Sequence, residues 1–328
     1  MTSRILIYGA TGYTGKLVAM QARDTQLSFE IAGRNATQVA ALAEQLDVPF
    51  RVFALDDPAT IIASLAGITA VLNCAGPFAS TARPLMEACI ECGVHYLDIT
   101  AEYKVYALAE AWSERAAAAG VMLLPGVGWD VVPSDCLAMY VAAKVDQPQS
   151  LRIALQVANS MSRGSTTSVG EILGVGLLVR TDGAIVANPD TNSARFDFGA
   201  GPVDSVPLSF GDLVTAWKST GIRNIAMFVN IKENVLPDGV AVMPDGPSLE
   251  ERIANRASVV AEVTGMDGTV VRARIDTVNG YLYTALAAVE ALRLVVSGQF
   301  KHGFQTPATA FGDGFAISIA DSRIVDMP

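Results

Sequence analysis

The chain has 328 residues, of which 51% are hydrophobic and 17% charged, so it can bury a sizeable core and is not a disordered protein. This length suggests two domains, or one large domain with an elaboration. Because 23 Lys and Arg stand against 33 Asp and Glu, the net charge is −10. No cluster of basic residues offsets this charge along the sequence, so nucleic-acid binding is not expected.

The four cysteines are too few for a disulfide scaffold in a chain of this length. No signal peptide precedes the apolar run that begins at Ile5, and no stretch reaches the roughly 18 uninterrupted apolar residues of a transmembrane helix. We therefore expect a cytoplasmic protein without an integral membrane segment.

Short apolar runs alternate with amphipathic helical patterns up to about residue 125. The expected strands are Arg4–Tyr8, Phe29–Ala32, Phe50–Leu55, Ala70–Asn73, His95–Ile99 and Val121–Leu124, and the expected helices are Lys16–Arg23, Ala36–Gln45, Ala59–Leu65, Arg83–Glu91 and Val105–Ala119. Strands that alternate with helices form a parallel sheet with right-handed crossovers. The sequence therefore predicts an α/β fold that opens with a Rossmann-type, doubly wound parallel sheet.

The pattern changes near Pro133, which suits the first turn of a helix. The expected helices are Ser134–Lys144, Thr166–Val179 and Tyr281–Val296, the expected strands are Leu151–Asn159, Ile225–Lys232 and Thr269–Thr277, and the expected loops are 182–212 and 237–247. This composition indicates a second, α+β domain with a mixed sheet. We expect residues 1–132, joined by 281–328, to form a dinucleotide-binding domain, and 133–280 to form a substrate and dimerisation domain.

A glycine-rich turn follows the first strand with the spacing Gly-x-x-Gly-x-x-Gly. Such glycines let the backbone turn tightly and approach a pyrophosphate at a helix N-terminus. The position between an expected strand and an expected helix favours a cofactor site over a turn without a ligand. The residues expected to bind the cofactor here are Gly9, Thr11, Gly12, Tyr13, Thr14 and Gly15.

The second strand indicates which cofactor is used. An NAD site places Asp or Glu near this point to hold the ribose hydroxyls, whereas Arg34 and Asn35 follow the strand here. A guanidinium can stack on adenine and bind a 2′-phosphate, so Arg34 favours NADP over NAD; a solvated surface arginine is the alternative. Asp56 either accepts a hydrogen bond from the adenine or caps the helix before Pro58.

The fourth strand ends in a turn of small residues. In this fold, ligands lie at the carboxyl ends of the strands, so the turn would let the cofactor backbone pass and hold a loop beside the nicotinamide. An ordinary strand-to-helix loop is the alternative. The residues expected to contact the cofactor are Cys74, Ala75, Gly76, Pro77 and Phe78.

Several motifs together resemble the saccharopine dehydrogenase-like oxidoreductases, a group that includes the trans-acting enoyl reductases. They are Gly9–Gly15, Ala32–Asn35, Asn73–Phe78, Ala88–Cys89, Gly93–Thr100, Pro133–Asp135 and Gly303–Gly312. The resemblance implies a Rossmann domain, an inserted mixed-sheet domain and C-terminal helices that pack back. The chain departs from the family pattern at Ala82, at Ala101 and at Trp129, and two of these positions, Ala82 and Trp129, border the expected substrate cleft.

Polar groups at the ends of the fifth and sixth strands are the candidates for chemistry. Asp98 and Asp130 could act as acid or base or could cap loops, and Arg163 could bind a substrate anion at a helix capped by Ser165 or Thr166. The plain alternative for Arg163 is a solvated side chain beside a helix cap. The expected substrate cleft contains Phe78, Glu102, Trp129 and Arg163.

We therefore expect an NADP-dependent oxidoreductase that reduces a C=C, C=O or C=N bond of a small or acyl-type substrate. Two alternatives stay open: a non-catalytic NADP sensor, and a short-chain dehydrogenase that uses Tyr140 and Lys144 as a Tyr-x-x-x-Lys pair. The short-chain hypothesis also requires a serine about a dozen residues before Tyr140, and the sequence has none at that position. No metal site is expected, because Cys89 and Cys92 form only one cysteine pair. A two-fold homodimer is expected from the second sheet.

Overall fold

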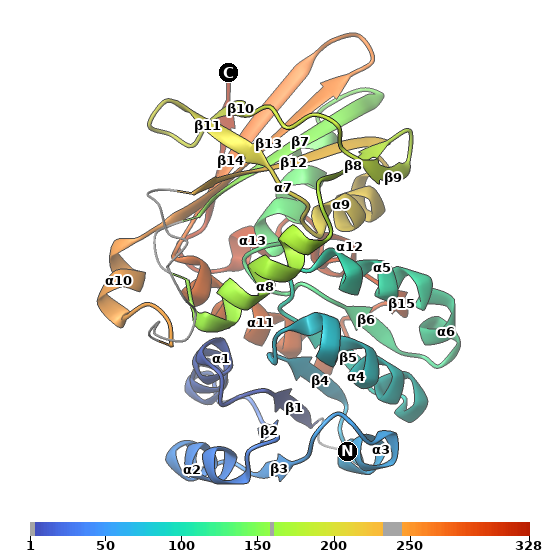
Figure 1. Cartoon of the computed structure of the whole chain (residues 1–328), viewed down its shortest axis with the longest axis vertical. Coiled ribbons are helices and arrows are strands. Elements are labelled where there is room, and N and C mark those ends of the chain that lie inside the picture. Colours follow the sequence, from blue (N-terminus) through green and yellow to red (C-terminus); the bar gives the residue numbers. More distant parts are fainter. Residues whose placement is uncertain (1–3, 158–160, 232–244) are drawn as a thin grey trace. The chain divides into compact units, whose positions relative to one another are not determined.

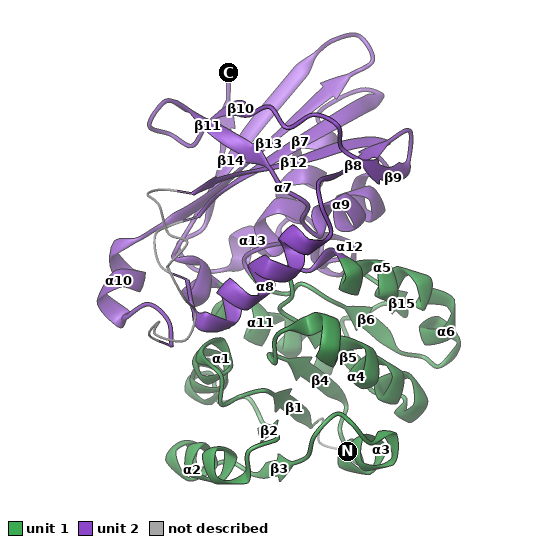
Figure 2. Cartoon of the chain, viewed as in Figure 1, with its two compact units in different colours: residues 1–100, 104–128, 284–305 green, residues 101–103, 129–283, 306–328 purple. Residues whose placement is uncertain are grey.

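The computed structural model describes residues 4–157, 161–231 and 245–328, and it divides into two compact units. The first unit contains residues 1–100, 104–128 and 284–305, and the second contains 101–103, 129–283 and 306–328 (Figure 2). Three of the expected elements fall partly outside the described residues. They are the strand Leu151–Asn159, the strand Ile225–Lys232 and the loop 237–247.

The first unit is built on a parallel sheet. Its described strands are β1 (Ile5–Tyr8), β2 (Phe29–Gly33), β3 (Phe50–Val52), β4 (Ala70–Asn73), β5 (His95–Asp98), β6 (Met122–Leu124) and β15 (Gly303–Phe304), in the order β15-β6-β5-β4-β1-β2-β3. The strands β1, β4, β5 and β6 are buried along their whole length, as their continuous apolar runs predict. The expected α/β fold with a Rossmann-type sheet is confirmed.

Helices connect these strands and cover the sheet (Figure 1). They are α1 (Tyr13–Asp24), α2 (Ala36–Leu46), α3 (Pro58–Ser64), α4 (Phe78–Cys92), α5 (Tyr103–Ala111), α6 (Ser113–Ala118) and most of α11 (Gly280–Val296). The chain crosses back over the sheet after β3, so that β4 lies beside β1, and the carboxyl ends of β1 and β4 form the switch point where ligands bind in this class of fold. The expected helix over Val105–Ala119 is interrupted at Trp112, so α5 and α6 are separate.

The second unit is built on a mixed sheet. Its described strands are β7 (Pro148–Val157), β8 (Leu178–Thr181), β9 (Ala184–Ala187), β10 (Ala194–Asp197), β11 (Pro202–Pro207), β12 (Asn224–Ile231), β13 (Ala257–Gly265), β14 (Val270–Thr277) and β16 (Arg323–Met327). The main path runs β10-β11-β12-β7-β13-β14-β16, and β8 pairs with β12 and β9. The helices are α7 (Val132–Ala142), α8 (Arg163–Gly174), α9 (Asp212–Thr220), α10 (Leu249–Ala254), α12 (Pro307–Phe311) and α13 (Phe315–Ser318).

The two faces of this second sheet differ in chemistry. Side chains alternate between faces along a strand, and one face of β7 carries Leu151, Ile153 and Leu155, all buried. Helix α7 packs on this side against β7, β13 and β14. The alternate positions on β7 carry the half-buried Arg152 and Gln156 and, between them, the buried Ala154, which places all three on the opposite face. The sheet therefore has one apolar face under α7 and one polar face.

The second unit differs from the sequence predictions in two places. The expected loop 182–212 contains the short strands β9, β10 and β11, because glycine, proline and aspartate here form the turns of hairpins rather than one long loop. The expected helix Thr166–Val179 ends at Gly174, and its last residues form β8. A β-branched and apolar run after two glycines suits an edge strand better than a helix end.

The C-terminal segment also differs from the expectation. Residues 284–305 belong to the first unit, as expected for 281–328, but 306–328 belong to the second unit. The reason is that β16 pairs antiparallel with β14, with Arg323 opposite Asp276 and Met327 opposite Arg272. The end of the chain thus completes the mixed sheet.

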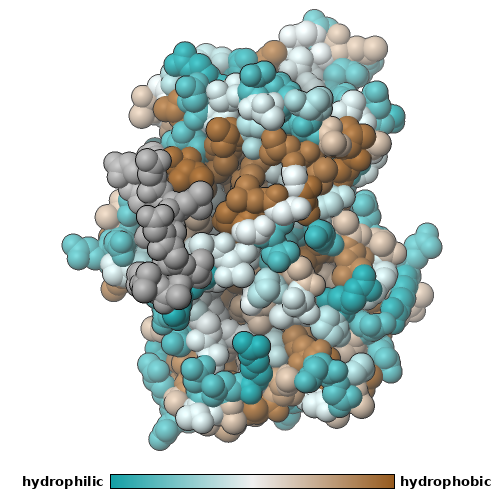
Figure 3. Space-filling view, viewed as in Figure 1, coloured by the Kyte–Doolittle hydropathy of each residue, from teal (hydrophilic) through white to brown (hydrophobic). Residues whose placement is uncertain are grey.

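Apolar side chains reach the surface of the second unit (Figure 3). Leu173 of α8, Val186 of β9, Val206 of β11 and Ile231 of β12 are among its exposed large apolar side chains. Within the described residues, no helix has the length and apolar character needed to cross a membrane.

Buried carboxyl groups lie where α7 packs on α9. Asp212 and Asp135 are fully buried, and burial raises the pKa of Asp135 to about 6 and that of Asp212 well above its ordinary value. Asp135 Oδ2 accepts from Ala308 N at 2.8 Å. Among the described residues, neither oxygen of Asp212 has a hydrogen bond of standard geometry, although the Ser134 hydroxyl lies near enough to lower the pKa of Asp212 in part. Because the charged forms are poorly solvated, the folded state favours the protonated acids.

This arrangement predicts an unusual pH dependence of stability. A folded-state pKa above the unfolded value means that stability falls as pH rises from about 4 through the folded pKa. Asp212→Asn removes one of these groups, so the loss of stability between pH 5 and pH 8 should shrink by about 1 kcal/mol or more. Urea unfolding at both pH values measures this difference. Asp204→Asn, at a well-exposed site in the same unit, is the control; an equal effect there would contradict the explanation.

Candidate functional site

The glycine-rich turn between β1 and α1 is shaped by close backbone contacts. A Cβ on Gly15 would collide with the carbonyl oxygen of Gly9, so this position admits no side chain. Gly12 differs: it is exposed, and a Cβ there would meet only Gly9 O at 3.4 Å. The turn thus needs Gly15 for its own fold, whereas Gly12 leaves an open approach at the N-terminus of α1.

The turn after β4 lies directly beside the glycine-rich turn. A Cβ on Gly9, which has a φ of +78°, would stand 2.7 Å from Ala75 N. Asn73 Oδ1 accepts from Ala75 N at 3.0 Å, and Thr81 Oγ1 donates to Ala75 O at 2.6 Å. The two turns that the sequence assigned to the cofactor therefore form one packed edge of the sheet.

Other residues of this edge have packing roles. Cys74 is buried, and burial raises the pKa of its thiol well above the usual range, so it is an inert thiol. Phe78 is buried at the start of α4, while Gly76 is exposed and Pro77 half-buried in the turn before it. Cys89 is buried late in α4 with a raised thiol pKa. Among the described residues, no group of three or more His, Cys, Asp or Glu side chains is placed to hold a metal ion.

Arg34 and Asp56 follow β2 and β3, and both are exposed. Both act on Tyr8: burial raises the pKa of the Tyr8 hydroxyl, the Arg34 charge lowers it and the Asp56 charge raises it. The two charges therefore lie near the same residue of β1. Asp57, rather than Asp56, caps α3 by accepting from Ala59 N and Thr60 N, and Asn35 caps α2 by accepting from Gln38 N at 3.1 Å.

Asp98 is engaged within the first unit. It is fully buried and accepts hydrogen bonds from Tyr96 Oη at 2.8 Å, Thr100 N at 3.0 Å and Gly126 N at 2.9 Å. These bonds fix the loops that follow β5 and β6. The geometry therefore gives Asp98 a positioning role at the end of the sheet.

A cluster of polar residues lies within the second unit around the N-terminus of α8. Ser162 Oγ accepts from Ser165 N at 3.1 Å and is the helix cap, where the sequence had suggested Ser165 or Thr166. Tyr281 Oη accepts from Ser162 N at 2.7 Å and bonds Ser165 Oγ at 2.9 Å. Farther along the helix, Ser168 Oγ donates to Glu102 Oε1 at 2.9 Å. Hydroxyl groups and one carboxylate thus tether α8.

Trp129 and Asp130 open the second unit beside this cluster. Trp129 is buried, donates from Nε1 to Thr277 Oγ1 at 2.9 Å and packs against Gly280. Asp130 is half-buried, and burial raises the pKa of its carboxyl to about 6. Its charge also acts on Tyr281, whose own pKa is raised chiefly by burial. A carboxyl that titrates near neutrality can give or take a proton under ordinary conditions.

The sequence-based candidates therefore separate into groups. Asp130, Trp129 and Glu102 are gathered in the second unit with α8, whereas Phe78 and Asp98 belong to the first. Arg163 is exposed and forms an ion pair with Asp245, so its charge is already partly compensated. The sequence predicts Tyr281 only as part of a helix and does not identify it as a member of this polar cluster. Its position in the first turn of the helix, just after Asn279-Gly280, is the feature that could have indicated it.

Tyr140 and Lys144 form a surface contact within the second unit. Lys144 Nζ donates to Tyr140 Oη at 2.8 Å and to Asp326 Oδ1 at 2.6 Å, and Tyr140 Oη donates to Asp326 Oδ1 at 3.2 Å. The pair thus joins α7 to β16. This role explains the Tyr-x-x-x-Lys spacing without a catalytic dyad.

Comparisons with known proteins agree with this geometry. Residues 5–124 match the family model described as the saccharopine dehydrogenase NADP binding domain. A human saccharopine dehydrogenase-like oxidoreductase is 26% identical over 162 residues, which cover 43% of this chain and 38% of the relative. A putative trans-acting enoyl reductase of Mycobacterium tuberculosis is 30% identical over 183 residues, covering 52% of this chain and 44% of the relative. The matches thus span less than half of these two relatives.

The fold has a solved counterpart. The apo saccharopine dehydrogenase (L-Glu forming) of Saccharomyces cerevisiae superposes with a TM-score of 0.64 at 11% identity, covering 99% of this chain and 100% of that chain. At this identity the likeness concerns the fold. Together with the matched domain and the sequence relatives, it confirms the expected resemblance to the saccharopine dehydrogenase-like oxidoreductases, and the matched residues 5–124, apart from 101–103, lie within the first unit.

Proposed function

We propose that the chain is an NADP-dependent oxidoreductase that transfers hydride to a C=C, C=O or C=N bond of a small or acyl-type substrate. The observation that carries this proposal is the packed edge formed by the turns at Gly9–Gly15 and Asn73–Phe78, with Arg34 at the end of the neighbouring β2. The relatives are named as an oxidoreductase and a putative enoyl reductase, which supports the reaction class.

The residues of the first unit fit a dinucleotide. The open approach at Gly12 leaves room for a pyrophosphate at the N-terminus of α1, where the first N–H groups of a helix lack intrahelical partners. Arg34 would bind the 2′-phosphate, and Asp56, which does not cap α3, could accept from the adenine amino group. When bound, the cofactor would supply the hydride from C4 of its nicotinamide.

Asp130 is the proposed proton donor. Because its pKa is raised to about 6, about a tenth of the Asp130 carboxyl is protonated at pH 7, far more than for a fully exposed aspartate. The chain reaches Asp130 a few residues after β6, which ends at the carboxyl edge of the parallel sheet. Asp98 is a weaker candidate because its carboxylate already accepts three hydrogen bonds.

The surroundings of Asp130 suggest the kind of substrate. The buried Trp129 side chain makes the protein interior next to Asp130 apolar, and the hydroxyl groups of α8 supply polar partners in the same unit. This mixture suits an acyl or carbonyl compound better than a highly charged one. Arg163 contributes little charge for an anionic substrate while it is paired with Asp245.

A panel of carbonyl, enoyl and imine compounds tests the proposal directly. Loss of NADPH absorbance with any member, and not without substrate, supports an oxidoreductase. Tight NADPH binding with no turnover across the whole panel would favour the non-catalytic NADP sensor.

The first prediction on this site concerns the glycine turn. Gly12→Ala should leave the fold intact, because the new methyl meets protein atoms only at ordinary contact distance, but it should occupy the approach of the pyrophosphate. Isothermal titration should show NADPH affinity reduced at least about tenfold. Gly314→Ala, where nothing lies within 4 Å of the added Cβ, is the control and should bind normally. Unchanged affinity in Gly12→Ala would argue against the assigned cofactor position.

The second prediction concerns cofactor choice. The unmodified protein should bind NADPH more tightly than NADH, and Arg34→Ala should remove most of that preference. A charge-assisted pair contributes roughly 1.5–3 kcal/mol, which corresponds to about ten- to a hundredfold in affinity. Titration of both cofactors into both proteins gives the ratio. Equal affinities for NADH and NADPH before any mutation would refute the role of Arg34.

The third prediction separates Asp130 from Tyr140. With an active substrate, Asp130→Asn should lower turnover by about 10²–10⁴-fold while NADPH affinity is kept, because the proton donor is lost. Turnover in the reducing direction should also fall as pH rises above about 6, where Asp130 ionises. Tyr140→Phe should have little effect, since its hydroxyl lies between Lys144 and Asp326. The reverse ranking would favour the short-chain mechanism.

A further inference from the structure

The polar face of the second sheet carries four arginines from three strands, β7, β14 and β16. The strand register places Arg152 opposite Glu262 and Glu262 opposite Arg272, in one row across β7, β13 and β14. A second row places Asp276 of β14 opposite Arg323 of β16. Arg274 lies on β14 between Arg272 and Asp276 and points to the same face. We call this surface, with its four arginines and two acids, the arginine face.

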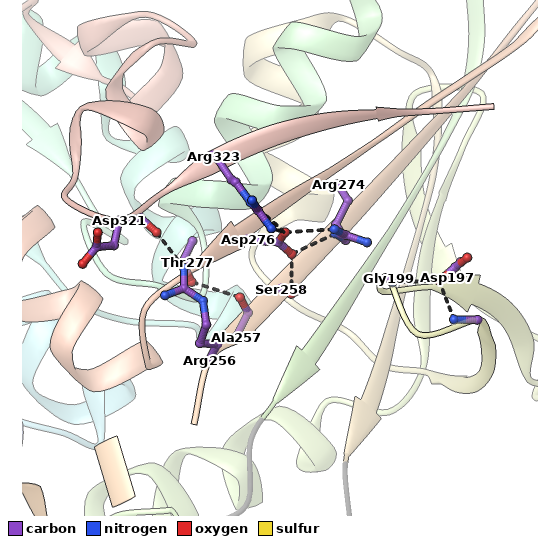
Figure 4. Close-up of polar contacts among 11 residues, drawn as sticks. Asp197, Gly199, Arg256, Ala257, Ser258, Arg274, Asp276, Thr277, Asp321 and Arg323 are labelled. Carbon is purple, nitrogen blue, oxygen red and sulfur yellow. Dashed lines mark hydrogen bonds and ion pairs between the residues drawn. The ribbon is translucent and has the colours of Figure 1, made fainter. Parts of the chain in front are cut away.

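Each acid on this face is shared by two arginines. Glu262 accepts from Arg152 at 3.0 Å and from Arg272 at 2.5 Å. Asp276 lies between Arg274 and Arg323, with Ser258 Oγ donating to it at 2.9 Å (Figure 4). These bonds and charges hold the pKa of Asp276 below its usual range, so it is ionised. Four positive and two negative charges leave a net charge of +2 in a chain of net charge −10.

On the arginine face, the side chains of the two acids are less exposed to solvent than those of Arg152, Arg272 and Arg323. The side chains of Glu262 and Asp276 are only 13% and 11% exposed, whereas those of Arg152 and Arg272 are each 37% and that of Arg323 is 73% exposed. An approaching molecule therefore meets guanidinium groups and not carboxylates. A guanidinium has five N–H donors in a planar fork, so one hydrogen bond to Glu262 leaves Arg272 with donors to offer.

The face is also rigid and partly covered by the chain itself. Phe196 and Phe198, in and just after β10, pack on Ala154 and Val260 in the middle of the face. The Arg152 guanidinium lies over the Phe196 ring at 4.8 Å from its centroid. The turn that follows β10 covers Arg274 closely at Gly199, which explains why Arg274 is only 15% exposed. The arginines left to a partner are therefore Arg152, Arg272 and Arg323.

We propose that the arginine face docks an acidic segment of a partner protein, whose carboxylates bind to Arg152, Arg272 and Arg323. Arg152 and Arg272 are two strands apart, about 10 Å, a spacing that neighbouring acidic side chains of a peptide can span. Arginine forks match carboxylates in geometry, and charge complementarity of this kind sets orientation and association rate. This proposal is independent of the proposed oxidoreductase function.

Other occupants fit the charges less well. A nucleic acid or an anionic membrane presents many negative charges at once, and a net charge of −10 on the whole chain repels such a surface at long range. A second copy placed face to face by a two-fold axis would bring arginines against arginines. A short acidic segment needs only the local excess of two charges.

The experiment measures binding of a fluorescently labelled oligo-glutamate peptide to the full chain by anisotropy, at low salt and at about 0.15 M salt. Arg272→Glu and Arg323→Glu should each weaken binding by about tenfold or more, and salt should weaken binding to the unmodified protein. Arg272→Gln, a milder change, should have an intermediate effect. Thermal melting of each variant verifies that it is folded.

Arg195→Glu is the matched control. It makes the same charge change in the same unit, but Arg195 alternates with Phe196 on β10, so it points to the opposite side of that strand, near Asp204 at 4.0 Å. An equal loss of binding in Arg195→Glu would show that only total charge matters and would overturn the proposal. So would binding of phosphatidylserine vesicles or an oligonucleotide, abolished by Arg272→Glu, when oligo-glutamate does not bind. Self-association that is lost in Arg272→Glu would identify a second copy as the occupant instead.

Discussion

The candidate cofactor site depends on the close approach of two backbone turns, after β1 and after β4. Gly9 and Ala75 come so near each other that no side chain fits at Gly9, and Gly15 must lie against the Gly9 carbonyl. The parallel order β4-β1-β2 forces this contact, because adjacent strands end at the same edge about 5 Å apart. Once the turns are packed, Gly12 and Arg34 lie at that edge as a consequence of the sheet order.

The second unit separates its charges by the two sides of one sheet. Burial raises the pKa of Asp135, in α7, to about 6 and that of Asp212, in α9, well above its ordinary value, so both are protonated more readily than an exposed aspartate. On the other side, Glu262 and Asp276 form ion pairs with arginines, and although burial raises the pKa of Asp276, its bonds to Arg274 and Ser258 bring it below its ordinary value. The pKa of aspartate is therefore shifted in opposite directions in the two places, because desolvation dominates in the first and ion pairing with hydrogen bonding in the second.

The first unit could be predicted from sequence almost element by element. Apart from the exposed edge strand β3, most of its strands are apolar runs buried on both faces, so strands such as Ile5–Tyr8 and Ala70–Asn73 are visible locally. The strands β9 to β11 were not predicted, since they are short, half-exposed and rich in turn residues. Their stability comes from pairing within the sheet and from contacts such as Phe196 on Ala154, which local patterns do not show.

Local sequence patterns also do not show which charged side chains lie together in the folded protein. Along the sequence no basic cluster is visible, because Arg152, Arg272 and Arg323 come from three distant strands, and only the register brings them together. Asp130 was visible as a candidate, but its raised pKa comes from burial and could not be read from its neighbours in sequence.

Two spacing motifs of the sequence differ in how strongly they constrain the structure, and the reason is physical. The glycine spacing at Gly9–Gly15 is constrained at each end, by the strand before it and by the backbone of Ala75 beside it, so few other structures would require the same residues. The spacing of Tyr140 and Lys144 requires only one helical turn, which brings any such pair within hydrogen-bond reach. Asp326 of β16 then suffices to explain both side chains. The Tyr140–Lys144 spacing occurs in any helix and therefore says little about chemistry. Positions such as Gly9 and Gly15, where no side chain fits, say much more about the structure that the sequence forms.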